Sequence, residues 1–194
     1  MKIIDDVIPV SIQNELEKNI LDPRFPWGHM FSSDLANEAS DDYVVLKRKE
    51  FQSDEIIDPG QFYHNILIDQ QPGQFFNWFT PILDAIKFED MRILRMKMNF
   101  NYPWIGNKES THGIPHVDLP NEKGYTTAIY YVTDGDGDTF LFNEKSGHKG
   151  PLTIKERVSP KKGRIVLFDG DTLHAACPPA ISNRPRIVVN INIR

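Results

Sequence analysis

The sequence predicts a mainly β fold in which flanking helices pack against an antiparallel sandwich or barrel. From Arg92 onward, short stretches rich in β-branched and aromatic residues alternate with turns that contain Gly, Pro, Asn or Asp. Helical spacing of apolar residues is confined to the part of the chain before Arg92. A chain of 194 residues without an internal repeat or an obvious linker fits one domain. We therefore expect residues 1–91 to form a flank of helices and strands, and residues 92–194 to form the β core.

Two helices are expected in the flank. Ser11 would cap the first helix, which ends before the Asp22-Pro23 pair. Its apolar face consists of Ile12, Leu16 and Ile20. The second helix follows an apolar stripe at helical spacing over residues 75–86, and Pro81 would open or kink it. Apolar stripes of this kind are typical of core packing, so we expect the flank to be structural.

Strands are expected where β-branched and aromatic residues cluster or alternate with polar ones. Two such stretches lie in the flank, Tyr43–Lys49 and Phe62–Ile68. A long strand with alternating apolar and polar residues follows Arg92. Its apolar residues are Leu94, Met96, Met98 and Phe100, and its polar residues are Arg95, Lys97, Asn99 and Asn101. The other predicted strands are Thr126–Val132, Asp138–Phe142, Pro151–Val158, Arg164–Phe168 and Arg186–Ile193.

Composition narrows the class of protein. Its 40% hydrophobic and 25% charged residues are those of a soluble globular protein. A net charge of −5 argues against broad binding of duplex nucleic acid or an anionic membrane. The single cysteine, Cys177, excludes an intrachain disulfide and fits a reducing compartment. The sequence has no secretory leader pattern and no bilayer-spanning stretch, so we expect a cytoplasmic protein. It gives no indication of oligomeric state.

Candidate metal ligands stand at His116, Asp118 and, after the predicted strand Arg164–Phe168, at His174. On an extended segment, residues two apart point to the same face, as two ligands of one ion require. The turn at residues 169–171 would bring His174 back to the same end of the barrel. Two imidazoles and one carboxylate form the facial set that holds iron(II) and leaves positions open for a cosubstrate and oxygen. Zinc could occupy the same three ligands, so the triad alone leaves the metal undecided.

A candidate cosubstrate anchor, Arg186, opens the last predicted strand. It shares one strand face with Val188, Asn190 and Asn192. A buried guanidinium needs a carboxylate partner, and a bidentate contact with a dicarboxylate cosubstrate would provide one. A salt bridge to a protein carboxylate is the alternative. Arg184, which precedes Pro185, is expected in a turn and remains the second candidate for the anchor.

At these residues the chain resembles the iron(II)/2-oxoglutarate-dependent dioxygenases, and within them the prolyl-4-hydroxylase-like branch. It is also similar to small, mostly uncharacterised oxygenases of phage and marine bacterial genomes. The resemblance covers residues 92–194 and implies a double-stranded β-helix, a cupin-like jelly-roll, with iron at its mouth. It is carried by Asn101-Tyr-Pro, Pro115-His-Val-Asp-Leu-Pro-Asn, Thr127-Ala-Ile-Tyr-Tyr-Val, Gly137-Asp-Thr-Phe-Leu-Phe, Gly163-Arg-Ile-Val-Leu-Phe-Asp, Leu173-His-Ala-Ala-Cys-Pro-Pro and Arg186-Ile-Val-Val-Asn-Ile.

The same resemblance implies roles for individual residues. His116, Asp118 and His174 would ligate iron(II), and Arg186 would hold the distal carboxylate of 2-oxoglutarate. Further contacts to this cosubstrate would come from Tyr131, Tyr102 and Asn190. Because Tyr131 and its neighbour Tyr130 point to opposite faces of their strand, only one of them can enter the pocket.

The implied reaction is a hydroxylation that consumes O2 and 2-oxoglutarate, with ascorbate as an optional reductant, and produces succinate and CO2. The substrate would be a peptidyl proline or a small molecule, and the host a bacterial or phage-infected cell. We expect the loops Trp104–Ile114 and Leu119–Tyr125 to contact the substrate. Within them Trp104 could stack on a ring and His112 could line the pocket mouth. Candidates for an apolar pocket wall are Phe140, Phe142, Ile129 and Leu167.

Other interpretations of the motifs remain open. The acidic run Asp134-Gly-Asp-Gly-Asp invites a calcium site, but Thr139 and Lys145 stand where an EF-hand needs Gly and Glu. We expect a turn there instead. A non-catalytic metal- or sugar-binding jelly-roll would need the triad but would have no use for Arg186 and Tyr131. A zinc hydrolase would need a general base beside His116, and none is evident.

Overall fold

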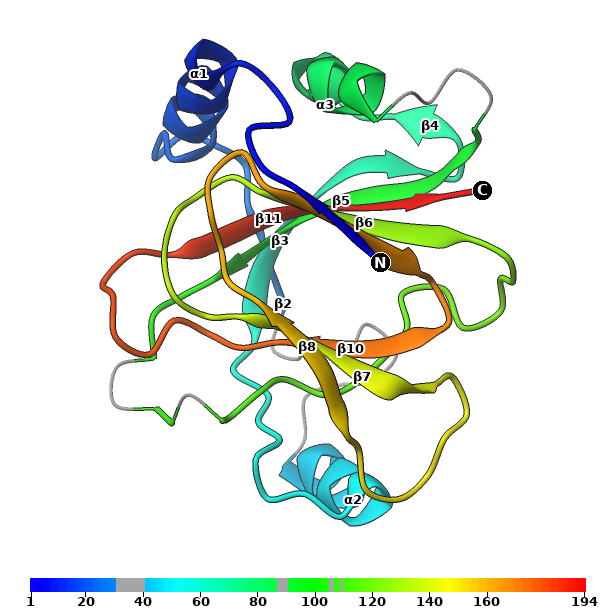
Figure 1. Cartoon of the computed structure of the whole chain (residues 1–194). Helices are drawn as coiled ribbons and strands as arrows, with labels where there is room; N and C mark the ends of the chain where they lie inside the picture. Colours follow the sequence, from blue (N-terminus) through cyan, green and yellow to red (C-terminus); the bar gives the residue numbers. More distant parts are fainter. Residues whose placement is uncertain (31–40, 87–90, 105–106, 109) are drawn as a thin grey trace.

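A computed structural model describes residues 1–30, 41–86, 91–104, 107–108 and 110–194 of the chain. In it two antiparallel sheets face each other, one of eight strands and one of three (Figure 1). The mainly β prediction is therefore confirmed. Helices α1 and α3 cover the outer side of the large sheet, and α2 lies beyond the small sheet (Figure 1). No helix in these described ranges is long and apolar enough to cross a membrane.

The large sheet has the strand order β1-β9-β6-β11-β5-β3-β2, with β4 paired to β3, and the small sheet has the order β10-β7-β8. The helices are α1 (Val10–Ile20), α2 (Asp41–Phe51), the 3₁₀ helix η1 (Phe76–Phe79) and α3 (Thr80–Ala85). The strands are β1 (Lys2–Ile4), β2 (Gly28–Met30), β3 (Gln61–Ile68), β4 (Gln71–Pro72), β5 (Ile93–Asn101), β6 (Thr126–Tyr131), β7 (Thr139–Lys145), β8 (Ile154–Val158), β9 (Ile165–Asp169), β10 (Thr172–Ala176) and β11 (Arg186–Ile193).

Strand β11 lies in the middle of the large sheet, and all of its residues are buried. It pairs with β5 on one side, where Arg186 is opposite Asn101 and Asn190 is opposite Lys97. It pairs with β6 on the other side, where Asn190 is opposite Ile129. Its apolar row, Ile187, Val189, Ile191 and Ile193, joins the main hydrophobic core. The alternate row, which begins at Arg186, faces the space between the two sheets, as the period-two pattern predicted.

Three clusters of buried apolar residues pack between the sheets and the helices. The largest joins the outer face of the large sheet to α1 and α3 and contains Leu16, Ile20 and Phe79. A second cluster contains Phe51 of α2 together with Phe140 and Phe142 of β7. A third contains Ile129, Tyr131, Leu141, Val158, Val166, Phe168 and Val188, which come from both sheets. This third cluster closes one part of the space between the sheets, and the remaining part is available for a site.

Most predicted elements are confirmed with shifted ends, and Pro81 does lie in the first turn of a helix, α3. The Ser11 cap is wrong, because α1 begins at Val10 after Pro9 and makes no side-chain cap hydrogen bond. Strand β10 was not predicted, although His174 lies on it. Its five residues form a strand because they pair with β7 and with the segment around His116.

The strand predicted for Tyr43–Lys49 is also wrong, because these residues lie in helix α2. Helical spacing places the Lys47 ammonium 5.5 Å from the Tyr43 ring centre and 5.7 Å from the Phe51 ring centre. It also allows an ion pair of 2.8 Å between Lys47 and Glu50. The helix buries Phe51 and leaves Leu46 exposed. These i, i+3 and i, i+4 contacts outweigh the β propensity of the two valines.

Candidate metal centre

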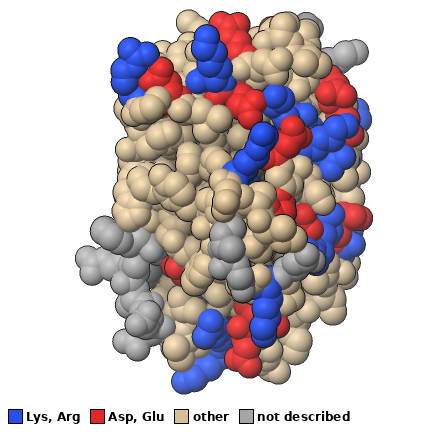
Figure 2. Space-filling model, turned by 90° about the vertical axis from the view of Figure 1, so that its left-hand side faces the viewer, with Lys and Arg blue, Asp and Glu red and all other residues tan. Residues whose placement is uncertain are grey.

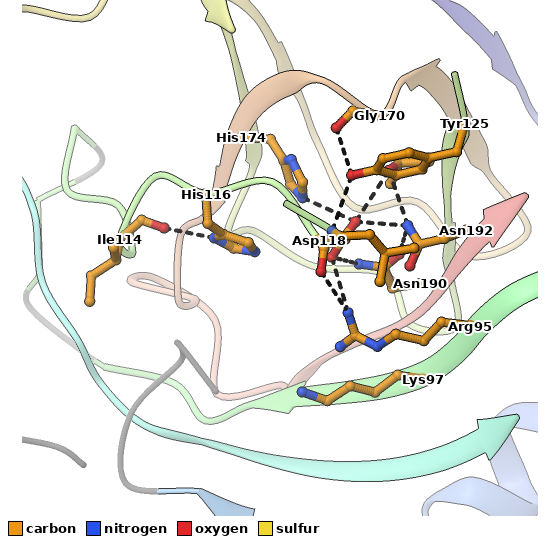
Figure 3. A network of polar contacts seen from close by, with 12 residues as sticks. Arg95, Lys97, Ile114, His116, Asp118, Tyr125, Gly170, His174, Asn190 and Asn192 are labelled. Atoms are coloured by element: carbon orange, nitrogen blue, oxygen red, sulfur yellow. Dashed lines mark hydrogen bonds and ion pairs between the residues drawn. The ribbon is translucent and has the colours of Figure 1, made fainter. Parts of the chain in front are cut away.

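His116, Asp118 and His174 converge at the inner face of the small sheet. The His116 segment continues this sheet, because the backbone N–H groups of His116 and His174 each donate to the other residue's carbonyl at 3.0 Å. This bridge places the two imidazole ring centres 4.8 Å apart. The Nε2 atom of His174 lies 3.6 Å from Oδ2 of Asp118. One ligand atom from each of the three residues lies within 4.8 Å of the other two (Figure 3).

The backbone fixes the orientation of both imidazoles. The Nδ1 atom of His116 lies 2.8 Å from the carbonyl of Ile114, and Nδ1 of His174 lies 3.1 Å from the carbonyl of Thr172. A carbonyl accepts only, so Nδ1 carries the proton in each ring and donates it. In the neutral form of such a ring Nε2 is the unprotonated nitrogen, which is the one that ligates a metal.

Strands β11 and β6 hold the Asp118 carboxylate (Figure 3). Oδ1 accepts a hydrogen bond from Nδ2 of Asn190 at 2.7 Å. Oδ2 accepts from Nδ2 of Asn192 at 3.0 Å and from Oγ1 of Thr127 at 3.2 Å. The guanidinium of Arg95 on β5 adds an ion pair with Oδ1 at 3.8 Å. These partners orient a carboxylate whose side chain is only 4% exposed, as the second layer around a metal does.

The surroundings of Asp118 and His174 favour the ionised carboxylate and the neutral imidazole, which are the forms that ligate a metal. Burial favours the neutral form of Asp118, but electrostatic interactions with His174, Arg95 and His116 and the Asn192 hydrogen bond lower the pKa of this carboxyl to about 2. Burial lowers the pKa of His174 to about 4, against the opposing attraction of Asp118. One carboxylate and two imidazoles whose ligand atoms lie this close together suit a divalent transition metal, so these residues fit an iron(II) ion.

The lowered pKa of His174 predicts a pH-dependent stability for the metal-free protein. The unfolded chain binds a proton at this histidine below about pH 6.5, whereas the folded protein binds it only near pH 4. The unfolded state therefore holds more protons between these values, and stability falls as the pH drops through this window. From pH 6.5 to 5 we expect His174 to account for a loss of about 2 kcal/mol. Asp118 adds a loss only below about pH 4, because its pKa is lowered.

Urea unfolding of chelator-treated protein at pH 7 and at pH 5 measures this effect. The control is His174→Ala, which removes the titrating group and should flatten the pH dependence. The prediction fails if wild type and His174→Ala lose the same free energy of unfolding between the two pH values.

The triad opens into a cavity of about 430 Å³ between the sheets. Arg186 lies on its wall and is 3% exposed. Its Nε donates to the carbonyl of Gly137 at 2.7 Å, and its Nη2 donates to Oγ1 of Thr139 at 2.6 Å. Its Nη1 lies 3.4 Å from Oδ1 of Asn101. No carboxylate within the described residues pairs with Arg186, so the alternative of a protein salt bridge is not supported. Arg184 is exposed.

Gly137 shapes the support of Arg186. It has φ of +97°, and a Cβ atom there would lie 2.7 Å from the carbonyl oxygen of Cys177. Only glycine fits this close approach in this conformation. The Gly137 carbonyl can therefore reach the guanidinium of Arg186. Nothing in the sequence around Gly137 indicated this contact.

The other predicted cosubstrate residues lie at different places. Asn190 lies on the cavity wall, where its side-chain amide donates a hydrogen bond to Asp118. Tyr131 is buried beside Arg186, with its ring centre 5.6 Å from the guanidinium carbon. Its hydroxyl lies 2.7 Å from Oγ1 of Thr139, and burial raises its pKa. Tyr130 points into the main core instead. Tyr131 is thus the one of the pair on the inner face, where it supports the residues around Arg186.

The structure does not bring Tyr102 to the cavity. Tyr102 follows Asn101, whose side chain points inward, so Tyr102 projects to the opposite face. There it packs against Phe100 and Phe62 at ring-centre distances of 4.8 and 5.3 Å and is 60% exposed. It shares a separate hollow of about 160 Å³ with Trp104, which is 47% exposed.

His112 is likewise absent from the cavity wall. It is 6% exposed, its Nδ1 lies 2.8 Å from the carbonyl of Gly113, and its ring packs on Phe140 and Phe142 of the second core. Of the predicted apolar wall, only Ile129 lines the cavity. Both phenylalanines lie in the second core, and Leu167 packs against the main core. Within the predicted substrate loops, residues 105, 106 and 109 lie outside the described ranges.

The acidic run has structural partners. Asp136 accepts backbone hydrogen bonds from Ala180, Ile181 and Ser182 at 2.6–2.9 Å. Asp138 forms an ion pair of 2.9 Å with Arg157. The Asp136 carboxylate thus holds the segment that precedes β11, and the run forms the predicted turn rather than a calcium site.

Cys177 is buried, and burial raises the pKa of its thiol to about 11. It therefore has little of the thiolate character that a metal ligand needs.

Sequence reasoning missed a polar row on the inner face of β5. Arg95, Lys97, Asn99 and Asn101 all line the cavity. The alternation of polar and apolar residues in this strand was visible in the sequence. A polar row on a strand expected in the middle of a sheet could have been recognised as a wall of the site, because buried polar side chains need partners.

Comparison with known proteins supports the same picture. Residues 100–194, which include the triad and Arg186, match the sequence model of the 2OG-Fe(II) oxygenase superfamily. No curated protein matches the chain. Among solved structures, a prolyl hydroxylase from Trichoplax adhaerens in complex with a peptide fragment has 14% identity and a TM-score of 0.58. The match covers 99% of this chain and 82% of that one.

Two further structures share the fold. The α-ketoglutarate-dependent epimerase SnoN from nogalamycin biosynthesis has 11% identity and a TM-score of 0.58, with 99% of this chain and 76% of that one covered. A viral collagen prolyl hydroxylase from Paramecium Bursaria Chlorella virus-1 has 15% identity and a TM-score of 0.50, with 100% and 94% covered. These likenesses confirm the predicted double-stranded β-helix.

Proposed function

Since this chain belongs to the 2OG-Fe(II) oxygenase superfamily and is an iron(II)- and 2-oxoglutarate-dependent oxygenase, we propose that it hydroxylates a small molecule or a peptide. His116, Asp118 and His174 would hold the iron. The observation that carries this proposal is their convergence within 4.8 Å on the wall of a cavity that also contains an unpaired arginine. When bound, iron(II) with 2-oxoglutarate and O2 supplies the oxidation, in which succinate and CO2 form and one oxygen atom enters a substrate C–H bond.

The protein's part begins with the cosubstrate. In this proposal Arg186 binds the distal carboxylate of 2-oxoglutarate in a charge-assisted, bidentate contact. Gly137 and Thr139 hold its guanidinium in place at 2.7 and 2.6 Å, so little rotamer freedom is lost on binding. Tyr131 supports this arrangement through its bond to Thr139. Cosubstrate binding would also supply the carboxylate partner that Arg186 lacks in the described residues.

Asp118 and the two histidines require fixed orientations, which the surrounding strands supply. Asn190, Asn192 and Thr127 donate hydrogen bonds to the two oxygens of Asp118 and fix their orientation. The carbonyls of Ile114 and Thr172 hold the Nδ1 protons of the histidines. Ile129 and Val188 add an apolar wall that limits the entry of water.

The fold does not decide between a peptide and a small molecule as the substrate. The Trichoplax prolyl hydroxylase is bound to a peptide, and SnoN comes from nogalamycin biosynthesis. Both kinds of substrate are therefore compatible with the proposal.

Succinate formation tests the proposal directly. Protein loaded with iron(II) and supplied with 2-oxoglutarate, ascorbate and air should form succinate slowly without a substrate and faster when a substrate is added. Zinc(II) in place of iron(II) is the matched control, because it fits the same ligands but undergoes no redox change. Succinate should then be absent. The proposed function would be wrong if iron-loaded protein that binds 2-oxoglutarate formed no succinate with or without candidate substrates.

A further inference from the structure

We propose that Lys97 and Asn99 form a substrate subsite in this cavity, which selects molecules that carry a carboxylate beside an N–H or O–H donor. The inference rests on the proposed function and specifies the class of substrate. α-Amino acids and α-hydroxy acids are the smallest molecules with this pair of groups.

Lys97 is a buried cation with a weak set of partners. Its side chain comes from β5 and extends alongside Arg95 (Figure 3), and the residue is 2% exposed. Its Nζ atom lies 3.6 Å from Sδ of Met30 and 5.2 Å from the ring centre of Tyr63. Within the described ranges it makes no ion pair. A charge taken out of water without a partner carries a large desolvation penalty, and this burial lowers the pKa of Lys97 to about 8.

The other cations of the cavity wall are accounted for. Lys47 pairs with Glu50 at 2.8 Å, and Arg95 pairs with Asp118 at 3.8 Å. Of the lysines and arginines that line the cavity within the described residues, Lys97 and Arg186 form no ion pair with a carboxylate, and Asp118 attracts Lys97 only from beyond ion-pair distance. On the surface the charges are mixed, as the face in Figure 2 shows, with Lys and Arg beside Asp and Glu. The two unpaired cations therefore stand out as features of the cavity.

One dicarboxylate cosubstrate does not satisfy both cations. Its distal carboxylate would bind Arg186, and its other carboxylate, with the adjacent keto oxygen, would bind the iron. Lys97 is opposite Asn190, and Asn190 holds Asp118 at 2.7 Å. Neighbouring strands lie about 4.8 Å apart, so an anion at Lys97 would lie on the floor of the cavity close to the metal. Arg186 is opposite Asn101, farther along the same strand pair. The position of Lys97 thus fits an anion of the substrate.

Asn99 adds the second part of the recognition. It follows Lys97 on the same face of β5 and lines the same cavity. Its Oδ1 atom is buried and has no hydrogen-bond partner in the described structure. A buried acceptor without a partner costs free energy that a ligand N–H or O–H would recover. A molecule with a carboxylate for Lys97 and a donor for Asn99 satisfies both groups.

The test uses the iron(II) and 2-oxoglutarate complex under anaerobic conditions. Its visible charge-transfer band is recorded while matched probes are added: the common L-amino acids and their amides, and L-hydroxy acids and their amides. We expect at least one acid to shift the band with an affinity at least 10-fold higher than its amide. In Lys97→Met this preference should disappear. Asn99→Val should weaken the amino acid more than the corresponding acid without the donor.

One control variant and two kinds of contradicting outcome complete the test. Lys47→Met removes a cavity lysine that already has a partner, and it should keep the preference for acids. Absence of the band in wild type would contradict the proposed function itself. The subsite would be wrong if wild type gave a normal band but showed no preference for acids. It would also be wrong if Lys97→Met kept the preference, or if Lys97→Met bound 2-oxoglutarate 10-fold more weakly.

Thermal unfolding separates a binding role from a structural one without any ligand. If Lys97 is kept for substrate binding, its unpaired charge destabilises the protein, and Lys97→Met should raise the melting temperature by about 2–4 °C. If Lys97 serves the fold through Met30 and Tyr63, the same variant should melt at a lower temperature, and the inference is then wrong.

Discussion

His174→Ala is expected to bind iron(II) more than about 100-fold more weakly than wild type and to form succinate at under about 1% of its rate. The side chain supplies one of three ligand atoms, and its loss leaves Asp118 and His116 as an incomplete set. The backbone bonds between His174 and His116 do not involve the side chain, so the fold should persist. Metal content after dialysis and succinate formation at saturating 2-oxoglutarate measure the effect.

His148→Ala is the matched control for this variant. His148 also lines the cavity, but it lies outside the group of converging ligand atoms. It should keep its iron and most of its activity. Equal loss of iron in both variants would mean that removal of any cavity histidine disturbs the site, and full iron binding by His174→Ala would remove His174 from the ligand set.

Arg186→Met should weaken 2-oxoglutarate binding by about 100-fold, a change of about 2.7 kcal/mol. Methionine keeps much of the side-chain volume but cannot pair with a carboxylate. Because Arg186 makes no contact with the triad in the described structure, iron(II) should bind with nearly unchanged affinity. Calorimetric titration of the iron-loaded protein with 2-oxoglutarate measures the difference.

Arg184→Met is the natural comparison, since the sequence leaves the two arginines as rival anchors. Arg184 is exposed before β11, whereas Arg186 is 3% exposed on the cavity wall. We expect Arg184→Met to bind 2-oxoglutarate like wild type. The reverse result, with weak binding in Arg184→Met and normal binding in Arg186→Met, would reassign the anchor.

The β core was predictable because it depends on a local pattern. The alternation in β5 and β11 assigns each residue to a face, and both strands occur close to the predicted bounds. The flank was harder to predict where tertiary contacts decide the structure. Residues 43–49 contain β-branched residues, but their helix is stabilised by contacts of Lys47 with Tyr43, Phe51 and Glu50. Strand β10 is too short for a pattern and exists because β7 and the His116 segment pair with it.

The proposed metal ligands and Arg186 were accessible from sequence because their spacing and strand faces are local. The groups that hold them were not, since Thr139 and Thr127 come from other strands, Gly137 precedes β7, and all three contact them only after folding. Tyr102 shows where a prediction from family resemblance differs from the structure. A family position suggested a pocket residue, but the side chain follows an inward-pointing Asn101 and therefore projects away from the cavity. The unpaired state of Lys97 likewise depends on which carboxylates surround it in three dimensions.

An anaerobic titration of the metal-free protein with iron(II) and 2-oxoglutarate tests whether this site binds both together. We expect a visible charge-transfer band that requires both components and saturates at one equivalent of iron. Such a band would show that 2-oxoglutarate chelates iron held by the protein. If the protein bound one equivalent of iron but gave no band at any concentration of 2-oxoglutarate, the proposed iron and 2-oxoglutarate site would be wrong.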